Sequence, residues 1–129
     1  MRLTRVLETV LYHRGGEADA MRRFYADVLG LRPVGNGFAF RIGDGLVLLF
    51  DADETAHQDR PPPHGAHGRG HACFVAPPDE YDAWKARLAT ADVAVKQEIV
   101  WPNGVRSFYF DDPAGNVLEI ADGDLWPTA

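Results

Sequence analysis

The chain has 129 residues, of which 46% are hydrophobic and 25% charged, as expected for a single globular domain. Its net charge of −6 argues against nucleic-acid binding and against anionic membranes, and leaves open a neutral or cationic small molecule as partner. One cysteine, Cys73, excludes an internal disulfide and a cysteine-only zinc site. No apolar run approaches the ~18 residues of a membrane span, and residues 1–11 lack the apolar core of a secretory signal, so we expect a cytoplasmic protein.

The first half of the chain predicts a strand, a helix and three further extended segments. β-Branched and aromatic residues dominate Arg5–Tyr12, which favours a strand. Apolar residues recur at helical spacing through Glu17–Leu29, and Gly30 follows as a helix-ending glycine. The remaining extended segments are Leu31–Val34, Phe38–Ile42 and Leu46–Phe50.

The stretch from Asp51 to Gly70 has a different composition. It contains Pro61-Pro62-Pro63, several glycines and no periodicity, so we expect a long connecting loop. After it the earlier pattern begins again, with a second helix expected over Asp79–Ala89. Strands are expected at Gly70–Ala76, Ala94–Trp101, Arg106–Asp111 and Val117–Ala121.

The two halves share one order of elements, which is strand, helix and three strands. Phe38–Phe50 can be laid on Phe108–Ile120, since each reads as a strand, a turn containing Asp and Gly, and a second strand. We therefore predict one domain built of two βαβββ modules. Module one covers residues 1–50, the connecting loop 51–69, module two 70–121, and a tail 122–129.

Three polar residues stand in strands that otherwise carry apolar side chains, namely Glu8, His71 and Glu119. A carboxylate that faces a core costs several kcal/mol unless it is paired or binds a metal. If all three face one cavity, one imidazole and two carboxylates form a facial set that suits manganese, iron, nickel, cobalt or zinc. Taken singly, each residue has the alternative of pointing to solvent or pairing with an arginine.

Three motifs resemble those of the vicinal oxygen chelate superfamily, which includes glyoxalase I, fosfomycin-resistance enzymes, extradiol dioxygenases and bleomycin-resistance proteins. The first motif is the helix end that reads FYADVLGL, and the second is GHACF around His71. The third runs from Tyr109 to Ile120 and reads YFDDPAGNVLEI. The resemblance covers nearly the whole chain and is weakest between Asp51 and Arg69.

The resemblance implies an α+β fold in which two βαβββ modules form an open, cavity-enclosing mixed β-barrel with the helices outside. It also implies one divalent metal per site (Mn, Fe, Zn, Ni or Co), with Glu8, His71 and Glu119 as ligands. The fourth ligand position of the superfamily matches Leu49 or Leu48, and neither can bind a metal. The chain thus looks like a three-ligand member, although many members have histidine or glutamine where Glu8 stands.

Enzymes of the superfamily chelate a substrate through two neighbouring oxygens on the metal, which acts as a Lewis acid. By this resemblance we expect a metal-dependent glyoxalase-like lyase or isomerase acting on a small oxygenated substrate. Glu119 and Glu8 are the candidate catalytic bases for proton transfer next to a carbonyl. Tyr109, Arg106 and Trp101 belong to the region beside Glu119 and are the candidate substrate-binding residues.

Two other functions remain open from the sequence. A metal-free protein resembling bleomycin-resistance proteins would hold a cationic drug, which suits the net charge of −6. A dioxygenase or a thiol transferase of the same superfamily is the other alternative. Superfamily members of this length are commonly homodimers, and the sheet edges left by two modules need covering, so we expect a homodimer.

Overall fold

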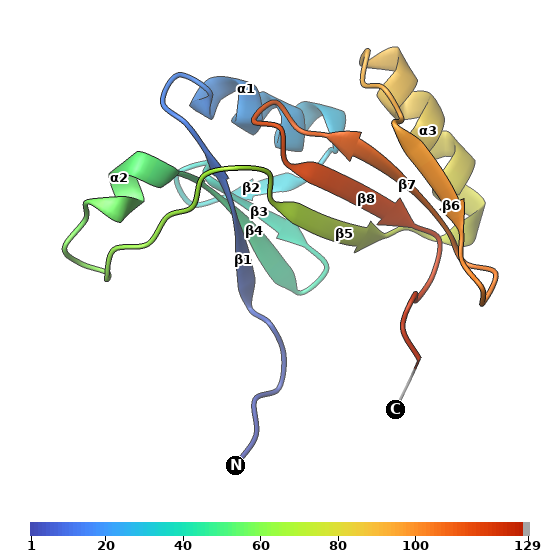
Figure 1. Ribbon diagram of the computed structural model, residues 1–129, viewed down its shortest axis with the longest axis horizontal. Helices are drawn as coiled ribbons and strands as arrows, with labels where there is room; N and C mark the ends of the chain where they lie inside the picture. Colours follow the sequence, from blue (N-terminus) through green and yellow to red (C-terminus); the bar gives the residue numbers. More distant parts are fainter. Residues whose placement is uncertain (128–129) are drawn as a thin grey trace. The chain divides into compact units, whose positions relative to one another are not determined.

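The computed structural model describes residues 1–127 and confirms the predicted α+β fold (Figure 1). The chain divides into two compact units, Met1–Gly68 and a second that begins at Arg69. The first unit contains β1 (Glu8–His13), α1 (Ala18–Arg23), the π-helical turn η1 (Phe24–Val28), β2 (Arg32–Val34), β3 (Ala39–Ile42), β4 (Gly45–Asp51) and α2 (Ala52–Ala56). The second contains β5 (His71–Val75), the 3₁₀ turn η2 (Pro78–Glu80), α3 (Tyr81–Thr90), β6 (Gln97–Val100), β7 (Arg106–Asp111) and β8 (Val117–Ala121).

The two sheets repeat one topology. The strand order is β1-β4-β3-β2 in the first unit and β5-β8-β7-β6 in the second. In each sheet the first pair of strands is parallel and the other pairs are antiparallel. Neither sheet closes on itself into a barrel. The internal repeat predicted from the sequence is thus a repeat of βαβββ topology.

One face of each sheet packs against a helical segment. In the first unit the ring of Tyr25 in η1 lies 6.0 Å from that of Phe40 in β3, and Val47 on the same face is buried. In the second unit Tyr81 of α3 meets Phe108 of β7 edge-on, with ring centroids 5.2 Å apart. Burial of these large apolar side chains supplies most of the favourable free energy of folding. Because side chains alternate along a strand, the neighbouring residues face the other way.

Several predicted boundaries were wrong, each for a local reason. The first strand begins at Glu8, because β4 begins at Gly45 and leaves the earlier residues without a strand to pair with. The first helix changes to a π-helical turn at Phe24, where the N–H of Leu29 donates to the Phe24 carbonyl at 3.0 Å. That turn buries Phe24 and Tyr25 together, which a strict 3.6-residue period does not reveal.

The segment from Asp51 to Gly70 is not an irregular loop throughout. Residues 52–56 form α2, whose first turn is capped by the Asp51 carboxylate, which accepts from the N–H of Asp53 at 2.9 Å. An aspartate followed by further acids is an ordinary helix-start signal that the search for apolar periodicity missed. The part that follows is fastened to the first unit, since the His64 N–H donates to the Thr55 carbonyl at 3.0 Å.

Candidate functional site

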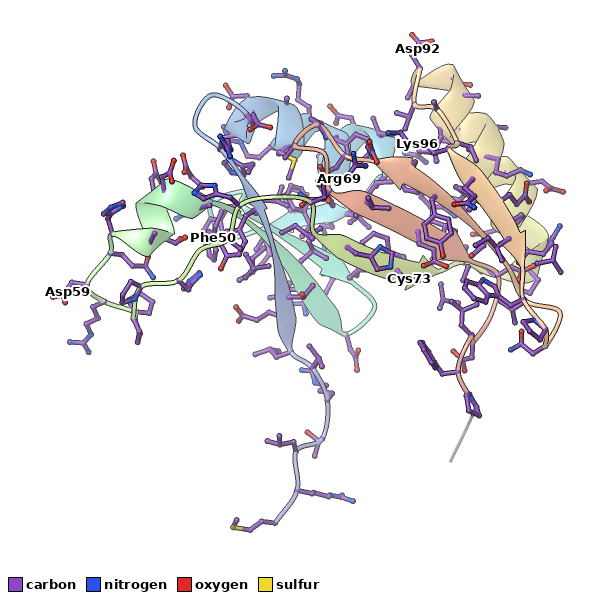
Figure 2. The ribbon with its side chains drawn as sticks, viewed as in Figure 1. Phe50, Asp59, Arg69, Cys73, Asp92 and Lys96 are labelled. Atoms are coloured by element: carbon purple, nitrogen blue, oxygen red, sulfur yellow. The ribbon has the colours of Figure 1, made fainter. Side chains whose placement is uncertain are left out.

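The face of the second sheet opposite α3, here called the site face, carries the residues of interest. Strand pairing sets Cys73, Glu119 and Tyr109 side by side across β5, β8 and β7. His71 lies two residues before Cys73 on β5 and therefore on the same face. Figure 2 shows the labelled Cys73 on β5. The structure thus brings together two of the three predicted metal ligands, His71 and Glu119, and one predicted substrate-binding residue, Tyr109.

His71 and Glu119 contact each other directly. The Nε2 atom of His71 lies 3.3 Å from Oε1 of Glu119. On the other side of the ring, Nδ1 lies 2.8 Å from the Val117 carbonyl oxygen. A carbonyl only accepts hydrogen bonds, so Nδ1 carries the proton and donates it. In the neutral imidazole, Nε2 then directs a lone pair at a carboxylate oxygen, an arrangement that needs a proton or a metal ion between the two atoms.

Glu119 is buried, with 3% of the residue exposed. Its Oε2 atom has no hydrogen-bond partner among residues 1–127. A buried carboxylate oxygen without a partner costs free energy, and native proteins keep such atoms mainly where function requires them. The carboxylate is therefore suited to a cation.

The Glu119 carboxylate also changes its two neighbours in the sheet. Burial, followed by the negative charge of Glu119, raises the pKa of the Cys73 thiol to about 12. Burial and then hydrogen bonding to Glu119 raise the pKa of the Tyr109 hydroxyl, while a hydrogen bond from Ser107 opposes this shift. Both side chains therefore stay protonated near neutral pH and serve as donors beside the carboxylate.

A buried polar turn fixes the start of β5, where His71 stands. Oδ1 of Asn116, a residue that is 2% exposed, accepts from the N–H of Gly70 at 2.9 Å. Nδ2 of Asn116 donates to Oδ2 of Asp112 at 2.9 Å. Through Gly70 this turn holds the backbone directly before His71. The DDPAGN part of the third sequence motif thus acts as a structural clamp for the site.

Glu8 belongs to the first unit and is the first residue of β1. It pairs with Leu46, as His71 pairs with Val117, so the two residues occupy equivalent positions in the two sheets. By the same register Leu48 corresponds to Glu119, whereas Leu49 lies on the α1 face. Over residues 1–127, neither unit by itself groups three histidine, cysteine, aspartate or glutamate side chains as a metal site.

The other two predicted substrate-binding residues are engaged by the protein itself. Nε1 of Trp101 donates to Oγ of Ser107 at 2.9 Å. Arg106 lies on the α3 face, with its guanidinium 4.2 Å from the ring centroid of Tyr81 and its Nε donating to Asp122 at 2.8 Å. The structure therefore does not bring Arg106 to the side of the sheet that carries His71 and Glu119.

Sequence reasoning missed Ser107 and His64. Ser107 is fully buried on the site face, and only its alternation with Phe108 would have marked it. His64 contacts the first sheet, where its Nδ1 lies 2.5 Å from the hydroxyl oxygen of Tyr12 and its ring lies 5.8 Å from that of Phe50. Figure 2 labels Phe50 beside the segment that carries this contact. The pairing of histidine with a distant tyrosine left no signal in the sequence.

Two aspartates make the stability of the second unit sensitive to acid. Burial would raise the pKa of Asp122, but hydrogen bonds from Arg106 outweigh it and hold that pKa below its usual value. Lys96 and Arg69 do the same for the pKa of Asp111 (Figure 2), with Arg69 at 2.6 Å. A lowered folded-state pKa adds stability above the ordinary pKa of about 4, and this stability is lost as pH falls through the folded value.

We therefore expect Asp122→Asn to lower the melting temperature by a few degrees at neutral pH and to flatten its fall in acid. Thermal unfolding followed by circular dichroism between neutral pH and about pH 3 measures both effects. Asp124→Asn, at an exposed position of the same segment, is the matched control and should leave the curve unchanged. Parallel acid curves for Asp122→Asn and the wild type would contradict this account.

Comparisons with known proteins agree with the fold described above. Residues 10–120 match the family model described as the glyoxalase/bleomycin resistance protein/dioxygenase superfamily. A crystal structure of lactoylglutathione lyase from Agrobacterium tumefaciens is 39% identical, with a TM-score of 0.88, over 99% of this chain and 100% of that one. Fosfomycin resistance protein FosX from Mesorhizobium loti is 20% identical, with a TM-score of 0.65, over 97% and 96% of the two chains, which supports the fold alone.

A search of curated proteins found no match. No helix within residues 1–127 is long and apolar enough to span a membrane. The family model covers most of the chain, and the similarity to the lactoylglutathione lyase extends over nearly all of it. The chain belongs to the glyoxalase/bleomycin resistance protein/dioxygenase superfamily.

Proposed function

We propose that the protein is a metal-dependent glyoxalase-like lyase or isomerase, and that its substrate is a small compound with two neighbouring oxygens. The observation that carries this proposal is the His71–Glu119 pair, in which a ring nitrogen and a buried carboxylate oxygen face each other at 3.3 Å. The unpartnered Oε2 of Glu119 supports it. The similarity to a lactoylglutathione lyase at 39% identity favours a lyase over the other activities of the superfamily.

His71 and Glu119 would hold one divalent metal ion, with Glu8 as the third ligand. The argument for Glu8 is its equivalence to His71, since both residues open the first strand of their sheet and share the same pairing register. An imidazole and two carboxylates suit manganese, iron, zinc, nickel or cobalt. When bound, the metal supplies Lewis acidity for an oxygen-chelated substrate.

The chain's own residues then have distinct tasks. The hydrogen bond from Nδ1 to the Val117 carbonyl fixes the His71 ring with Nε2 directed at Glu119. A carboxylate, Glu119 or Glu8, takes the proton from the substrate carbon next to the carbonyl and returns it to a neighbouring atom. Tyr109, a protonated donor beside Glu119, is suited to contact a substrate oxygen.

Metal content tests the proposal. Elemental mass spectrometry on protein without a histidine tag should find close to one metal per chain in the wild type and almost none in His71→Ala. His57→Ala is the matched control, because His57 lies at the end of α2 in the other unit and should not affect metal content. A wild type that takes up no manganese, iron, nickel or zinc on incubation would contradict the proposal and favour metal-free drug binding.

We also propose that the protein functions as a homodimer. Strands β1, β2, β5 and β6 are edge strands in their own sheets, and edges of this kind are commonly covered by a partner. Light scattering coupled to size-exclusion chromatography should give twice the monomer mass of 14.2 kDa. A mass of one chain at all concentrations would overturn the dimer. The cytoplasmic location expected from the sequence stays a prediction.

A further inference from the structure

Residues 1–7, here called the arm, carry apolar side chains that the chain itself does not cover. Eight large hydrophobic residues are exposed among residues 1–127, and four of them lie in the arm, namely Met1, Leu3, Val6 and Leu7. Leu3 is fully exposed, and Val6 is 78% exposed. Single exposed hydrophobic residues are common on proteins, but four within seven residues are typical of a contact surface.

The arm continues the line of β1 and runs away from the first sheet (Figure 1). Strand β1 is an edge strand, and the Leu46 N–H donates to the Leu7 carbonyl at 3.0 Å where the arm joins it. The Arg5 guanidinium donates to the carbonyl of Asp44, in the turn between β3 and β4. These two contacts fix the base of the arm, so its apolar side chains are presented in a defined direction.

Charge favours a second copy of the chain as the partner of the arm. The arm contains Arg2 and Arg5 and no acidic residue. The second unit, from Arg69 onward, contains ten acidic and five basic residues, whereas residues 1–68 contain nine acidic and eight basic ones. A basic arm is therefore attracted to the second unit of another copy. An anionic membrane would attract the arm but repel a chain whose net charge is −6.

The second unit also has the apolar surface that the arm needs. The other four exposed large hydrophobic residues among residues 1–127 all belong to this unit, namely Val75, Val95, Val100 and Trp126. Val75 ends β5 and Val100 ends β6, and these are the two edge strands of the second sheet. An extended segment that adds to such an edge gains backbone hydrogen bonds and covers exposed side chains at the same time.

We propose that the arm of each chain docks on an edge strand of the second sheet of another copy, so that two copies exchange arms. The exchange is two-fold symmetric, since each copy gives its arm and receives that of its partner. The inference rests on the proposed homodimer and names its interface. Leu3 and Val6 cover Val75 or Val100 of the other copy, while the arm's two arginines face its acidic surface.

The dissociation constant of the dimer, measured by analytical ultracentrifugation on the full-length chain, tests the role of the arm. The double variant Leu3→Ser/Val6→Ser should raise this constant by about 100-fold or more, because two buried apolar side chains leave each arm contact. Arg2→Glu/Arg5→Glu should also raise it, and added salt should weaken the wild-type dimer. Arg23→Glu, at an exposed position of α1, is the matched charge control and should leave the constant unchanged.

A double-mutant cycle between the arm and the sheet edges tests the docking site. Val75→Ser and Val100→Ser are each combined with Val6→Ser, and the proposal requires non-additive losses, by about fivefold or more, with one of the two valines. All three residues are exposed within the chain, so the variants should fold as the wild type does. Circular dichroism of each variant checks this.

The outcomes separate the arm from the dimer. An unchanged dissociation constant in Leu3→Ser/Val6→Ser, or additive losses with both valines, would overturn the exchange of arms and leave the homodimer standing. A wild type that sediments as one chain at all concentrations would overturn both, while the metal site is tested separately by metal content. Arm-dependent binding to vesicles of anionic lipid, with the dimer unaffected by the arm variants, would assign the arm to a membrane and overturn the proposal.

Discussion

Replacing Glu119 by glutamine is expected to have opposite effects on stability and on metal binding. At mildly alkaline pH the metal-free Glu119→Gln protein should be more stable than the wild type, by about 1–3 kcal/mol, the cost of an unsatisfied buried polar group. The neutral amide removes a buried charge whose Oε2 has no partner, and its NH₂ group can take the place of the carboxylate oxygen beside Nε2 of His71. Metal affinity should fall by about 100-fold or more, since an amide is a far poorer ligand than a carboxylate.

The measurement is a pair of experiments on the same protein samples. Chemical denaturation of chelator-treated protein gives the free energy of unfolding, and titration calorimetry with Mn²⁺ gives the affinity. Glu98→Gln is the matched control, because Glu98 accepts hydrogen bonds from Tyr81 at 2.8 Å and from Lys85 at 3.0 Å. That substitution should lower stability slightly and leave metal affinity unchanged. A Glu119→Gln protein that is both less stable and equally able to bind metal would show that the carboxylate is structural.

This expected trade-off follows from where the chain places charge. A residue selected for folding alone at the Glu119 position would be apolar, as Leu48 is at the equivalent position of the first sheet. The carboxylate instead stays buried beside a histidine whose ring orientation is fixed by a backbone carbonyl. Strained or unsatisfied groups of this kind are commonly retained at sites where function requires them.

The sequence was sufficient to predict the fold at the level of elements and repeat. Strand period and turn residues predicted Arg106–Asp111 and Val117–Ala121 with the bounds that the structure has. It was not sufficient to predict an element whose local sequence signal is weak, or a strand boundary that depends on the partner strand. Helix α2 depends on one capping aspartate, and the start of β1 depends on where β4 begins.

For the site, polar residues in apolar strands predicted Glu8, His71 and Glu119 as one set, of which the structure shows His71 and Glu119 in contact. Their contact distance, the proton on Nδ1 and the unpartnered oxygen of Glu119 come from three-dimensional geometry, and no residue pattern encodes them. Arg106 shows the converse, because its strand was expected to lie beside that of Glu119, which suggested a place in the site. Side chains alternate along β7, so Arg106 faces the opposite way from its neighbour Ser107. It therefore lies on the α3 face, against Tyr81.

Removing the Asn116 side chain is the second change with a large expected effect. Asn116→Ala deletes the acceptor for the Gly70 N–H and the donor to Asp112, both at 2.9 Å and both in a buried turn. Two hydrogen bonds are lost, one of them to a charged group in a buried turn, so a total loss of about 3–4 kcal/mol is expected. Because Gly70 directly precedes His71, the site is disturbed as well, and Mn²⁺ affinity should fall by about tenfold.

Urea denaturation and Mn²⁺ titration measure the two effects, and Asn103→Ala provides the matched control. Asn103 makes comparable hydrogen bonds in a turn, since its Oδ1 accepts from Val105 at 3.1 Å and its Nδ2 donates to the Asp124 carbonyl at 3.0 Å. It is exposed, so water replaces its lost partners, and the expected loss is below about 1 kcal/mol. Equal losses for the two variants would show that burial of the Asn116 turn contributes nothing, and an unchanged Mn²⁺ affinity in Asn116→Ala would show that the turn does not position His71.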